Sequence, residues 1–258
     1  MLRSLDTAEQ AMQMQQVRLD TLANNLANMD AVGFKQVLTR VSEPPRENPQ
    51  SGPESLPAGL GRTGRNQLNW EPTQQQLLTQ AVDVRAGSLT TTGRPTDVAL
   101  LSEGFFVIQT ENGEEYTRNG SFRLDDQRRL VTTDGLPLAG TGGPLTIEGA
   151  AYSIERDGAV MVDGGQIGQL RVVNFAAPDR LRHAGNSRLA APDGMEAEPV
   201  AREQVHIEQG MLEGSNVDPV ITLVNMIAAQ RAFEIESKIL QTNDESLDKS
   251  INTLGQIS

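Results

Sequence analysis

The sequence of 258 residues contains no cysteine, which excludes disulfide bonds, thiolate metal sites and cysteine nucleophiles. Aromatic residues make up only 3% of the chain and hydrophobic residues 37%, which is low for a globular domain. The length still allows one large domain or two small ones. We therefore expect that something other than a single dense core holds this chain together.

Positive charge and long apolar runs are also scarce. The chain has 22 Lys and Arg against 34 Asp and Glu, a formal net charge of −12 with no basic cluster, so nucleic-acid binding is not expected. No stretch approaches the roughly 20 apolar residues of a membrane helix. The opening MLRSLDTAEQ contains acids where a secretory signal has an apolar run, so we expect no cleaved signal peptide.

Residues 1–30 have the periodicity of a helix. An apolar residue recurs every seven positions and another follows three positions later, with Gln15 as the polar exception. This a/d pattern predicts a coiled-coil seam, although an ordinary amphipathic helix packed on its own domain also gives it. We expect the helix to end at Gly33, and its seam residues are Leu5, Met12, Leu19, Leu22 and Leu26.

Residues 218–254 repeat the pattern over a longer stretch. Asp218-Pro219 opens the stretch with proline at a natural first-turn position, and neither Gly nor Pro interrupts residues 220–254. Such a helix would be roughly 50 Å long, too long for a small domain to cover. We expect the two end helices to pair with each other or with other subunits. The heptad positions are Met226, Phe233, Leu240, Leu247 and Leu254, and the stripe is widened by Ile227, Ile235, Ile239 and Ile251.

The middle of the chain has a different character. Residues 42–80 are rich in proline and glycine, which predicts a loop or an extended arm. Residues 82–208 alternate short apolar runs with Asn-Gly and Asp-Gly dipeptides, which supply the positive φ of hairpin turns, as at 112–113, 119–120, 134–135, 157–158 and 163–164. The predicted strands are Val98–Leu101, Phe105–Gln109, Glu115–Arg118, Arg129–Thr132, Ala151–Ile154, Val160–Val162 and Gly168–Asn174.

No group of residues has the pattern of a catalytic or metal site. The sequence contains no G-x-S-x-G elbow, no H-x-x-x-H and no EF-hand loop, and His183 and His206 are expected to be surface or packing residues. Gly59–Gly64 matches G-x-G-x-x-G, but no predicted strand precedes it and no predicted helix follows it. We therefore expect no enzymatic activity, no cofactor, no metal and no small-molecule substrate.

Both ends of the chain resemble the signatures of flagellar rod and hook proteins. Asn24–Asn28 (NNLAN) with Val32–Lys35 (VGFK) resembles their N-terminal signature, and Gly210–Val217 (GMLEGSNV) with Met226–Lys238 resembles their C-terminal one. The resemblance covers essentially the whole chain. In the middle it is carried by Gly104–Val107, Tyr116–Phe122 and Leu130–Gly135, which are similar to the family's β domain.

Within the family, the length indicates rod proteins with one β domain. The strings at 142–144, 157–158, 168–175 and 181–186 resemble proximal-rod members most, with distal-rod members as the alternative. The resemblance implies a structural subunit that polymerises into the rod, the axial drive shaft that carries torque through the periplasm to the hook. It implies export through the flagellar type III apparatus, and as partners further copies, other rod proteins and, as a further candidate, hook protein.

The predicted fold class is α+β. Long N- and C-terminal helices are expected to pair as a coiled-coil domain, with an inserted all-β domain and an extended arm. The predicted boundaries are 1–35 with 212–258 for the helical domain, 36–81 for the arm and 82–211 for the β domain.

The predicted assembly interface combines the helix seams with residues of the two terminal signatures. Burying one seam residue would contribute roughly 1.5–3 kcal/mol, partly offset by the entropy lost in ordering the helix. The predicted interface residues are Leu5, Met12, Leu19, Leu22, Asn24, Asn25, Leu26, Asn28, Gly33, Phe34, Gly210, Leu212, Glu213, Ser215, Asn216, Val217, Met226, Ile227, Gln230, Arg231, Phe233, Leu240 and Leu247.

Two other functions compete with this interpretation. A secreted β-rich binding or adhesin module would need an exposed aromatic or charged face, and the middle of the chain offers few aromatic residues. A hydrolase would need a pocket with a perturbed carboxylate, whereas the acid pairs Glu114-Glu115 and Asp125-Asp126 fall in predicted turns.

Overall fold

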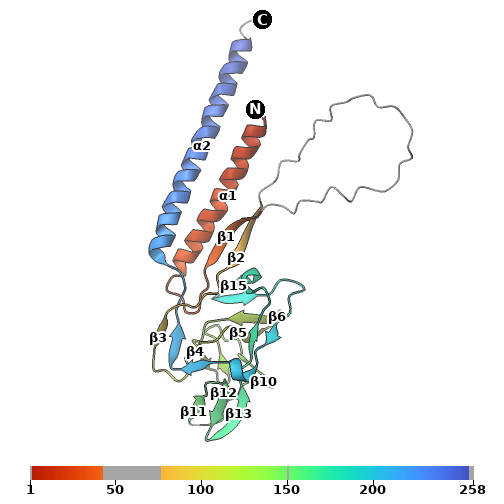
Figure 1. Cartoon of the computed structure of the whole chain (residues 1–258), viewed down its shortest axis with the longest axis vertical. Helices are drawn as coiled ribbons and strands as arrows, with labels where there is room; N and C mark the ends of the chain where they lie inside the picture. Colours follow the sequence, from red (N-terminus) through yellow and green to blue (C-terminus); the bar gives the residue numbers. More distant parts are fainter. Residues whose placement is uncertain (1, 43–76, 150, 256–258) are drawn as a thin grey trace, which may run out of the picture.

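Two helices, one from each end of the chain, lie side by side and project from a β-rich remainder (Figure 1). The computed structural model describes residues 2–42, 77–149 and 151–255, with α1 at Leu2–Ala27 and α2 at Pro219–Gly255. α1 ends before the predicted stop at Gly33. α2 begins at Pro219 because the Asp218 carboxylate accepts the backbone N–H groups of Val220 at 2.9 Å and Ile221 at 3.0 Å, the geometry of a helix N-cap.

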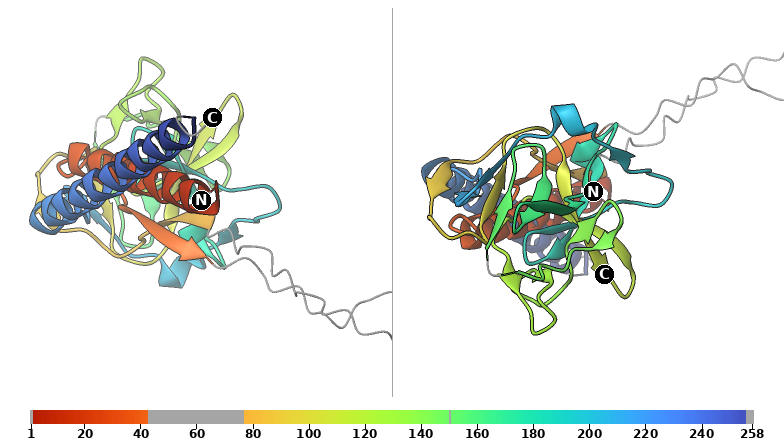
Figure 2. Two further views of the ribbon diagram at one scale, coloured as in Figure 1. Left: turned by 90° about the horizontal axis from the view of Figure 1, so that it is seen from above. Right: turned by 90° about the horizontal axis from the view of Figure 1, so that it is seen from below.

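The predicted coiled-coil pairing is wrong, and with it the predicted fold class. The helices pack together, but every heptad residue whose side chain is described is only half-buried. The fully buried residues of the described helices are small or polar, namely Thr21, Asn25, Thr222 and Ala229. α1 divides its contacts between α2 and a β-hairpin, so the continuous knobs-into-holes seam that a coiled coil requires does not form. Figure 2 (left) shows α2 passing across α1.

The hairpin beside α1 pairs β1 (Val37–Ser42) with β2 (Leu77–Val82) in antiparallel register. Asn25 of α1 fixes the hairpin to the helix, because its side-chain amide donates to the carbonyl oxygen of Val37 at 2.7 Å and accepts the Val37 N–H at 2.9 Å. Most of the predicted arm, residues 43–76 of 36–81, lies outside the described residues.

A six-stranded antiparallel sheet forms the centre of the β-rich part, with strand order β15-β16-β6-β5-β14-β17. Its strands are β5 (Phe105–Thr110), β6 (Gly113–Thr117), β14 (Val172–Asn174), β15 (Arg182–Gly185), β16 (Arg188–Ala190) and β17 (Glu198–Pro199). A second sheet orders β11 (Tyr152–Ile154), β12 (Ala159–Val162) and β13 (Gly165–Gln169).

The remaining described strands form pairs. β3 (Leu89–Thr91) pairs with β19 (Met211–Glu213), β4 (Val98–Leu100) with β18 (Ile207–Gln209), β7 (Arg123–Leu124) with β8 (Leu130–Val131), and β9 (Ala139–Gly140) with β10 (Gly143–Pro144). Short 3-10 turns occur at η1 (Pro178–Arg180) and η2 (Arg202–Gln204).

Two local predictions need correction. The single strand predicted at Gly168–Asn174 is divided between β13 and β14, which belong to different sheets. Asn119-Gly120 is not a hairpin turn: Gly120 lacks a positive φ, and its carbonyl oxygen accepts the N–H of Val98 at 3.0 Å. By contrast, Asp163-Gly164 has φ values of 49° and 83° and joins β12 to β13, as a type I′ turn requires.

The core lies on both faces of β5, because alternate residues of a strand point to opposite sides. Phe106 packs in one buried cluster with Phe122, while Phe105 and Val107 pack in another with Tyr116. The aromatic residues of the β-rich part are thus used in these two clusters, and this part of the chain buries its own core without help from the helices.

Candidate functional site

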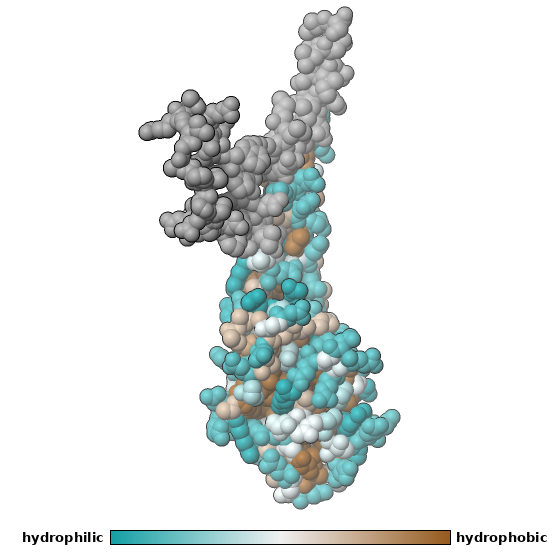
Figure 3. Space-filling view, turned by 90° about the vertical axis from the view of Figure 1, so that its right-hand side faces the viewer, coloured by the Kyte–Doolittle hydropathy of each residue, from teal (hydrophilic) through white to brown (hydrophobic). Residues whose placement is uncertain are grey.

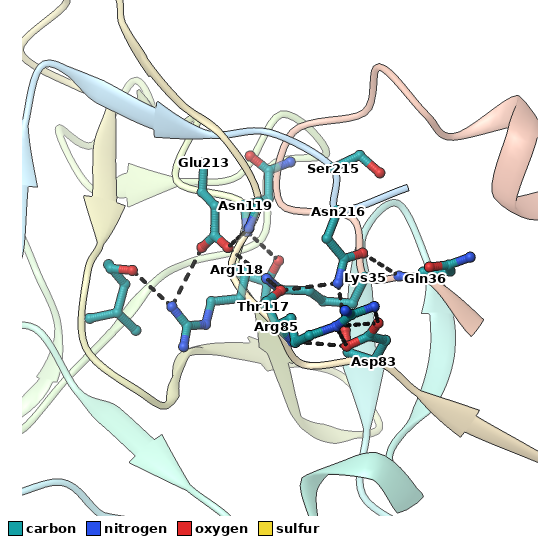
Figure 4. Close-up of polar contacts among 12 residues, drawn as sticks. Lys35, Gln36, Asp83, Arg85, Thr117, Arg118, Asn119, Glu213, Ser215 and Asn216 are labelled. Atoms are coloured by element: carbon teal, nitrogen blue, oxygen red, sulfur yellow. Dashed lines mark hydrogen bonds and ion pairs between the residues drawn. The ribbon is translucent and has the colours of Figure 1, made fainter. Parts of the chain in front are cut away.

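A buried carboxylate holds three segments of the chain together (Figure 4). Glu213 ends β19, and its side chain is 1% exposed. Its Oε1 atom accepts hydrogen bonds from Nζ of Lys35 at 2.6 Å and from the backbone N–H of Gly87 at 2.9 Å. Its Oε2 atom lies 3.4 Å from Nη1 of Arg118. One carboxylate therefore links the segment after α1, the segment before β3 and the end of β6.

Both cations that share this carboxylate are buried, Lys35 as deeply as Glu213 and Arg118 slightly less so. Lys35 is 1% exposed, and its Nζ also donates to the carbonyl oxygen of Arg85 at 2.8 Å. Burial lowers the pKa of Lys35 and outweighs the opposing attraction of Glu213. The guanidinium of Arg118 lies over the ring of Phe105, 5.5 Å from its centroid. Two buried cations thus share the buried carboxylate of Glu213.

Asn216, three residues after Glu213, adds hydrogen bonds from its uncharged side-chain amide. Its Oδ1 atom accepts the backbone N–H of Gln36 at 2.8 Å, and its Nδ2 donates to the carbonyl oxygens of Asp83 at 2.8 Å and Arg85 at 3.0 Å. The Asp83 carboxylate pairs with the Arg85 guanidinium, and this hydrogen bond lowers the pKa of Asp83. We call residues 33–37, 83–88, 117–119 and 213–217 the junction.

Two glycines allow the junction backbones to approach each other. Gly33 has φ +66° and donates its N–H to the carbonyl oxygen of Glu213 at 2.7 Å, and a Cβ there would lie 2.2 Å from the nitrogen of Asn119. A Cβ on Gly87 would lie 2.1 Å from the carbonyl oxygen of Gly214. Neither position has room for a side chain, so the sequence requires glycine at both.

An aromatic contact closes the junction on the side of β15. The rings of Phe34 and His183 stack with centroids 4.9 Å apart, and Nε2 of His183 lies 2.8 Å from the carbonyl oxygen of Lys35. Burial lowers the pKa of His183, and the bond to this carbonyl only partly opposes the shift. The imidazole is therefore a packing group that donates to the backbone.

The polar groups of the junction connect segments of the chain to one another. Its ionic groups are paired with each other and with backbone carbonyls, and no nucleophile lies beside a free base among the described junction residues. In the described part of the chain no three His, Asp or Glu side chains gather as a metal site. Neither of the two described helices is long and apolar enough to cross a membrane.

The structure brings together signature residues from both ends of the chain. At or beside the junction lie Gly33, Phe34, Leu212, Glu213, Ser215, Asn216 and Val217. Their role as an interface between subunits stays a prediction. What their contacts show is a connection within one chain.

The other predicted interface residues lie away from the junction. Gly210 turns β18 into β19, and Asn28 bonds back to the carbonyl oxygen of Asn24 on α1. On the helices the half-buried residues are Met12, Leu19, Leu22, Leu26, Met226, Phe233 and Leu240, and the exposed ones are Ile227, Gln230 and Arg231. Leu5 and Leu247 belong to the helices, but their side chains lie outside the described part.

Sequence reasoning missed half of the junction. Lys35, Asp83, Arg85, Gly87 and Arg118 were not predicted as site residues, although Lys35 and Arg118 lie inside the strings that carry the family resemblance. What these five residues share in the sequence is that each is a charged residue or a glycine beside residues that are buried in the fold. That signal does not say which charges pair, because the partners are far apart in the sequence.

Three flagellar family models match the chain, and each matched segment contains one member of the buried set formed by Lys35, Arg118 and Glu213. They are described as "Flagella basal body rod protein" over residues 5–35, "Flagellar hook protein FlgE/F/G D1 domain" over 99–162 and "Flagellar basal body rod FlgEFG protein C-terminal" over 208–254. Lys35, Arg118 and Glu213 fall in them in that order.

Whole-length relatives agree with these models. The chain is 34% identical to the flagellar basal-body rod protein FlgG of Bacillus subtilis over 98% of this chain and 99% of the relative. It is 32% identical to the rod protein FlgF of Caulobacter vibrioides over 93% of each. Similar identity to FlgG and FlgF leaves proximal and distal members undistinguished. The resemblance found in the sequence is confirmed, and the chain belongs to the flagellar basal-body rod protein family, a family of structural subunits without enzymatic activity.

Proposed function

We propose that this rod protein is a torque-carrying axial subunit whose junction couples the helix pair rigidly to the β-rich part. The observation that carries the proposal is the buried set of Lys35, Arg118 and Glu213, which ties both chain ends to the β-rich part. A subunit of a drive shaft has to resist twisting between its inner and outer parts. A joint made of paired buried charges resists it, because opening the joint exposes or separates each pair.

The geometry also supports a defined angle at this joint. Gly33 and Gly87 place backbone against backbone, and Asn216 bonds three backbone groups from two other segments. Contacts between backbone groups allow fewer alternative conformations than contacts between long side chains, which have many rotamers. The direction of the helix pair relative to the sheet is therefore fixed by the main chain itself.

Membership of the family indicates the kind of partner, and the export route is part of the proposal. As a member of the rod family the protein assembles with other rod and hook proteins at the hook-basal body. Within that setting we propose a position in the periplasmic part of the rod, with the proximal rod favoured, and delivery by the flagellar type III export apparatus. The absence of cysteine supports the periplasmic position, because stray thiols would cross-link in an oxidising compartment.

The test is incorporation into isolated basal bodies. A tagged wild-type chain, expressed in its parent bacterium in place of the chromosomal copy, should co-purify with hook-basal bodies and support swimming. Gold labelling of the tag should lie towards the inner-membrane end of the rod if the subunit is proximal and towards the hook if it is distal. A chain that supports swimming without entering the basal body contradicts the proposal.

The mechanical aspect of the proposal needs a variant that assembles. Glu213→Gln should reduce swimming more in viscous medium than in plain medium, because a compliant joint fails first at high load. The matched control is Glu208→Gln on the neighbouring strand β18. This change removes the carboxylate that pairs with Arg156 at the surface. Equal swimming of the two variants at high load contradicts a mechanical role for the junction.

A further inference from the structure

α2 has a buried side and, opposite to it, an apolar side that is exposed. At 100° per residue, Thr222, Met226 and Ala229 share the side that is buried or half-buried. Val224 and Ile227 lie on the other side and are 60% and 53% exposed. Of the twelve exposed large hydrophobic residues in the described chain, seven lie on α2: Val220, Ile221, Leu223, Val224, Ile227, Ile235 and Ile239. An exposed cluster of large apolar residues normally marks a surface that another molecule covers, so this outer face needs a partner.

A groove large enough to hold a short stretch of helix lies elsewhere on the same chain. It has a volume of about 1150 Å³ and runs between α1, the β1–β2 hairpin and η1. Its lining is partly apolar, with Val17 from α1, Val82 from the hairpin and Leu181 beyond η1. Figure 3 shows weakly hydrophobic residues gathered at the level where the helices meet the β-rich part, below a largely hydrophilic helix surface.

The groove and the outer face of α2 agree in size. The segment from Val220 to Ile227 is about 12 Å long, and a helix about 10 Å across fills on the order of 900 Å³ over that length. The groove is therefore large enough for this two-turn segment.

The charges agree as well. Asp20 stands on the α1 wall of the groove. The opposite wall carries Asp179, Arg180 and Arg182, and because the Asp179 carboxylate pairs with Arg40 of the hairpin at 3.3 Å, this wall keeps a net positive charge. The outer face of α2 carries Arg231 and Glu234, one turn beyond its apolar part and about 60° apart around the helix. A helix with a cation towards the acidic wall and an acid towards the basic wall matches this arrangement.

We infer that the outer face of α2 in one copy docks in the groove between α1 and the β1–β2 hairpin of a second copy. The inference rests on the proposed function, since it names the surfaces through which the axial subunit meets its like. The two surfaces are different regions of one chain, so the contact is head-to-tail. Repetition of a head-to-tail contact gives an open helical assembly in place of a closed dimer.

Cross-linking tests the contact directly, because the chain has no cysteine of its own. Val17→Cys and Ile227→Cys are made as separate full-length variants and mixed under mild oxidation at high concentration. The mixture should give a disulfide-linked dimer at least tenfold faster than either variant alone, since bridged residues need close Cα atoms. The double variant should give a ladder of higher oligomers.

The matched control moves the first cysteine from the groove to an exposed isoleucine position of the β-rich part. Ile167→Cys on β13 mixed with Ile227→Cys should give only the background rate. Cross-linking of Val17→Cys with Ile227→Cys at that same rate overturns the inference, as does a double variant that yields only monomer with an internal bridge.

Charge reversal supplies a second readout. Arg231→Asp and Asp20→Arg, each added to the cysteine variants, should each lower the cross-linking rate, and their combination across the contact should restore it. Absence of rescue overturns the assigned pairing of Arg231 in one copy with Asp20 in the other. Failure here with normal entry into basal bodies refutes only this contact, whereas absence from basal bodies refutes the proposed function whatever the cross-linking shows.

Discussion

Replacing Glu213 with glutamine removes the only anion of the buried charge set while keeping its shape. The side chain can still accept the N–H of Gly87, but Lys35 and Arg118 lose their shared counter-ion. Removing one partner of a buried pair costs about 3–5 kcal/mol, and the retained acceptor places Glu213→Gln near 3 kcal/mol. For a chain of this size that loss lowers Tm by roughly 6–12 °C.

The measurement is urea unfolding at pH 7, followed by far-UV circular dichroism and tyrosine fluorescence, whose transitions should coincide if unfolding is two-state. Glu208→Gln is the control, because its pair with Arg156 is largely exposed and such pairs contribute about 0–1 kcal/mol. A loss below about 1 kcal/mol in Glu213→Gln would show that the junction charges are solvated in solution, and would refute the reasoning.

A pH series sharpens the result. Burial already lowers the pKa of Lys35, and loss of Glu213 should lower it further, so Lys35 can shed its proton in the folded variant. The folded variant then binds fewer protons than the unfolded chain, and its stability relative to wild type should recover as pH rises from 7 towards 9. A deficit that stays constant over this range contradicts the assignment of the lost energy to an unpaired lysine.

Three further predictions use the same unfolding assay. Gly33→Ala should destabilise the fold by more than the roughly 1–2 kcal/mol of a left-handed alanine, because its Cβ would meet the backbone of Asn119. Gly93 has φ +70° in open space, so Gly93→Ala should cost only that amount. Equal losses would refute the close approach at Gly33. The folded pKa of His183 is lowered below its unfolded value near 6.5, so stability should fall as pH drops below about 6.5, and His183→Gln should flatten this slope; an unchanged slope contradicts the buried imidazole. Asp218→Ala should cost about 1 kcal/mol by removing the cap of α2, and a loss of helix signal confined to its first turns should accompany it.

Local sequence rules carried the prediction of the elements a long way. The start of α2 at Pro219 and the turn at Asp163-Gly164 follow from cap and turn chemistry, which acts over a few residues. The strands at Phe105–Thr110 and Ala159–Val162 follow from short apolar runs bounded by turns. Errors arose where a neighbour from elsewhere intervened, as at Asn119-Gly120, whose backbone is held by Val98 of β4.

The shortage of hydrophobic residues now has a structural account. The β-rich part places its few aromatic residues on both faces of β5 and buries them there. The helices spread their apolar residues over more surface than one chain can cover, and the outer side of α2 remains exposed. The heptad count correctly located two helices, but the same count could not say that α1 would share its buried side between α2 and the β1–β2 hairpin.

By itself the sequence determined the types of element, their approximate ends and, through its terminal signatures, the family. Only the tertiary structure decided which charges meet, because Lys35 and Glu213 are separated by 178 residues and Arg118 and Glu213 by 95. A buried charge needs a partner wherever it lies, so sequence can indicate that a buried lysine will be paired. Which carboxylate pairs with it depends on how two distant segments cross, and that is set by the packing of the whole molecule.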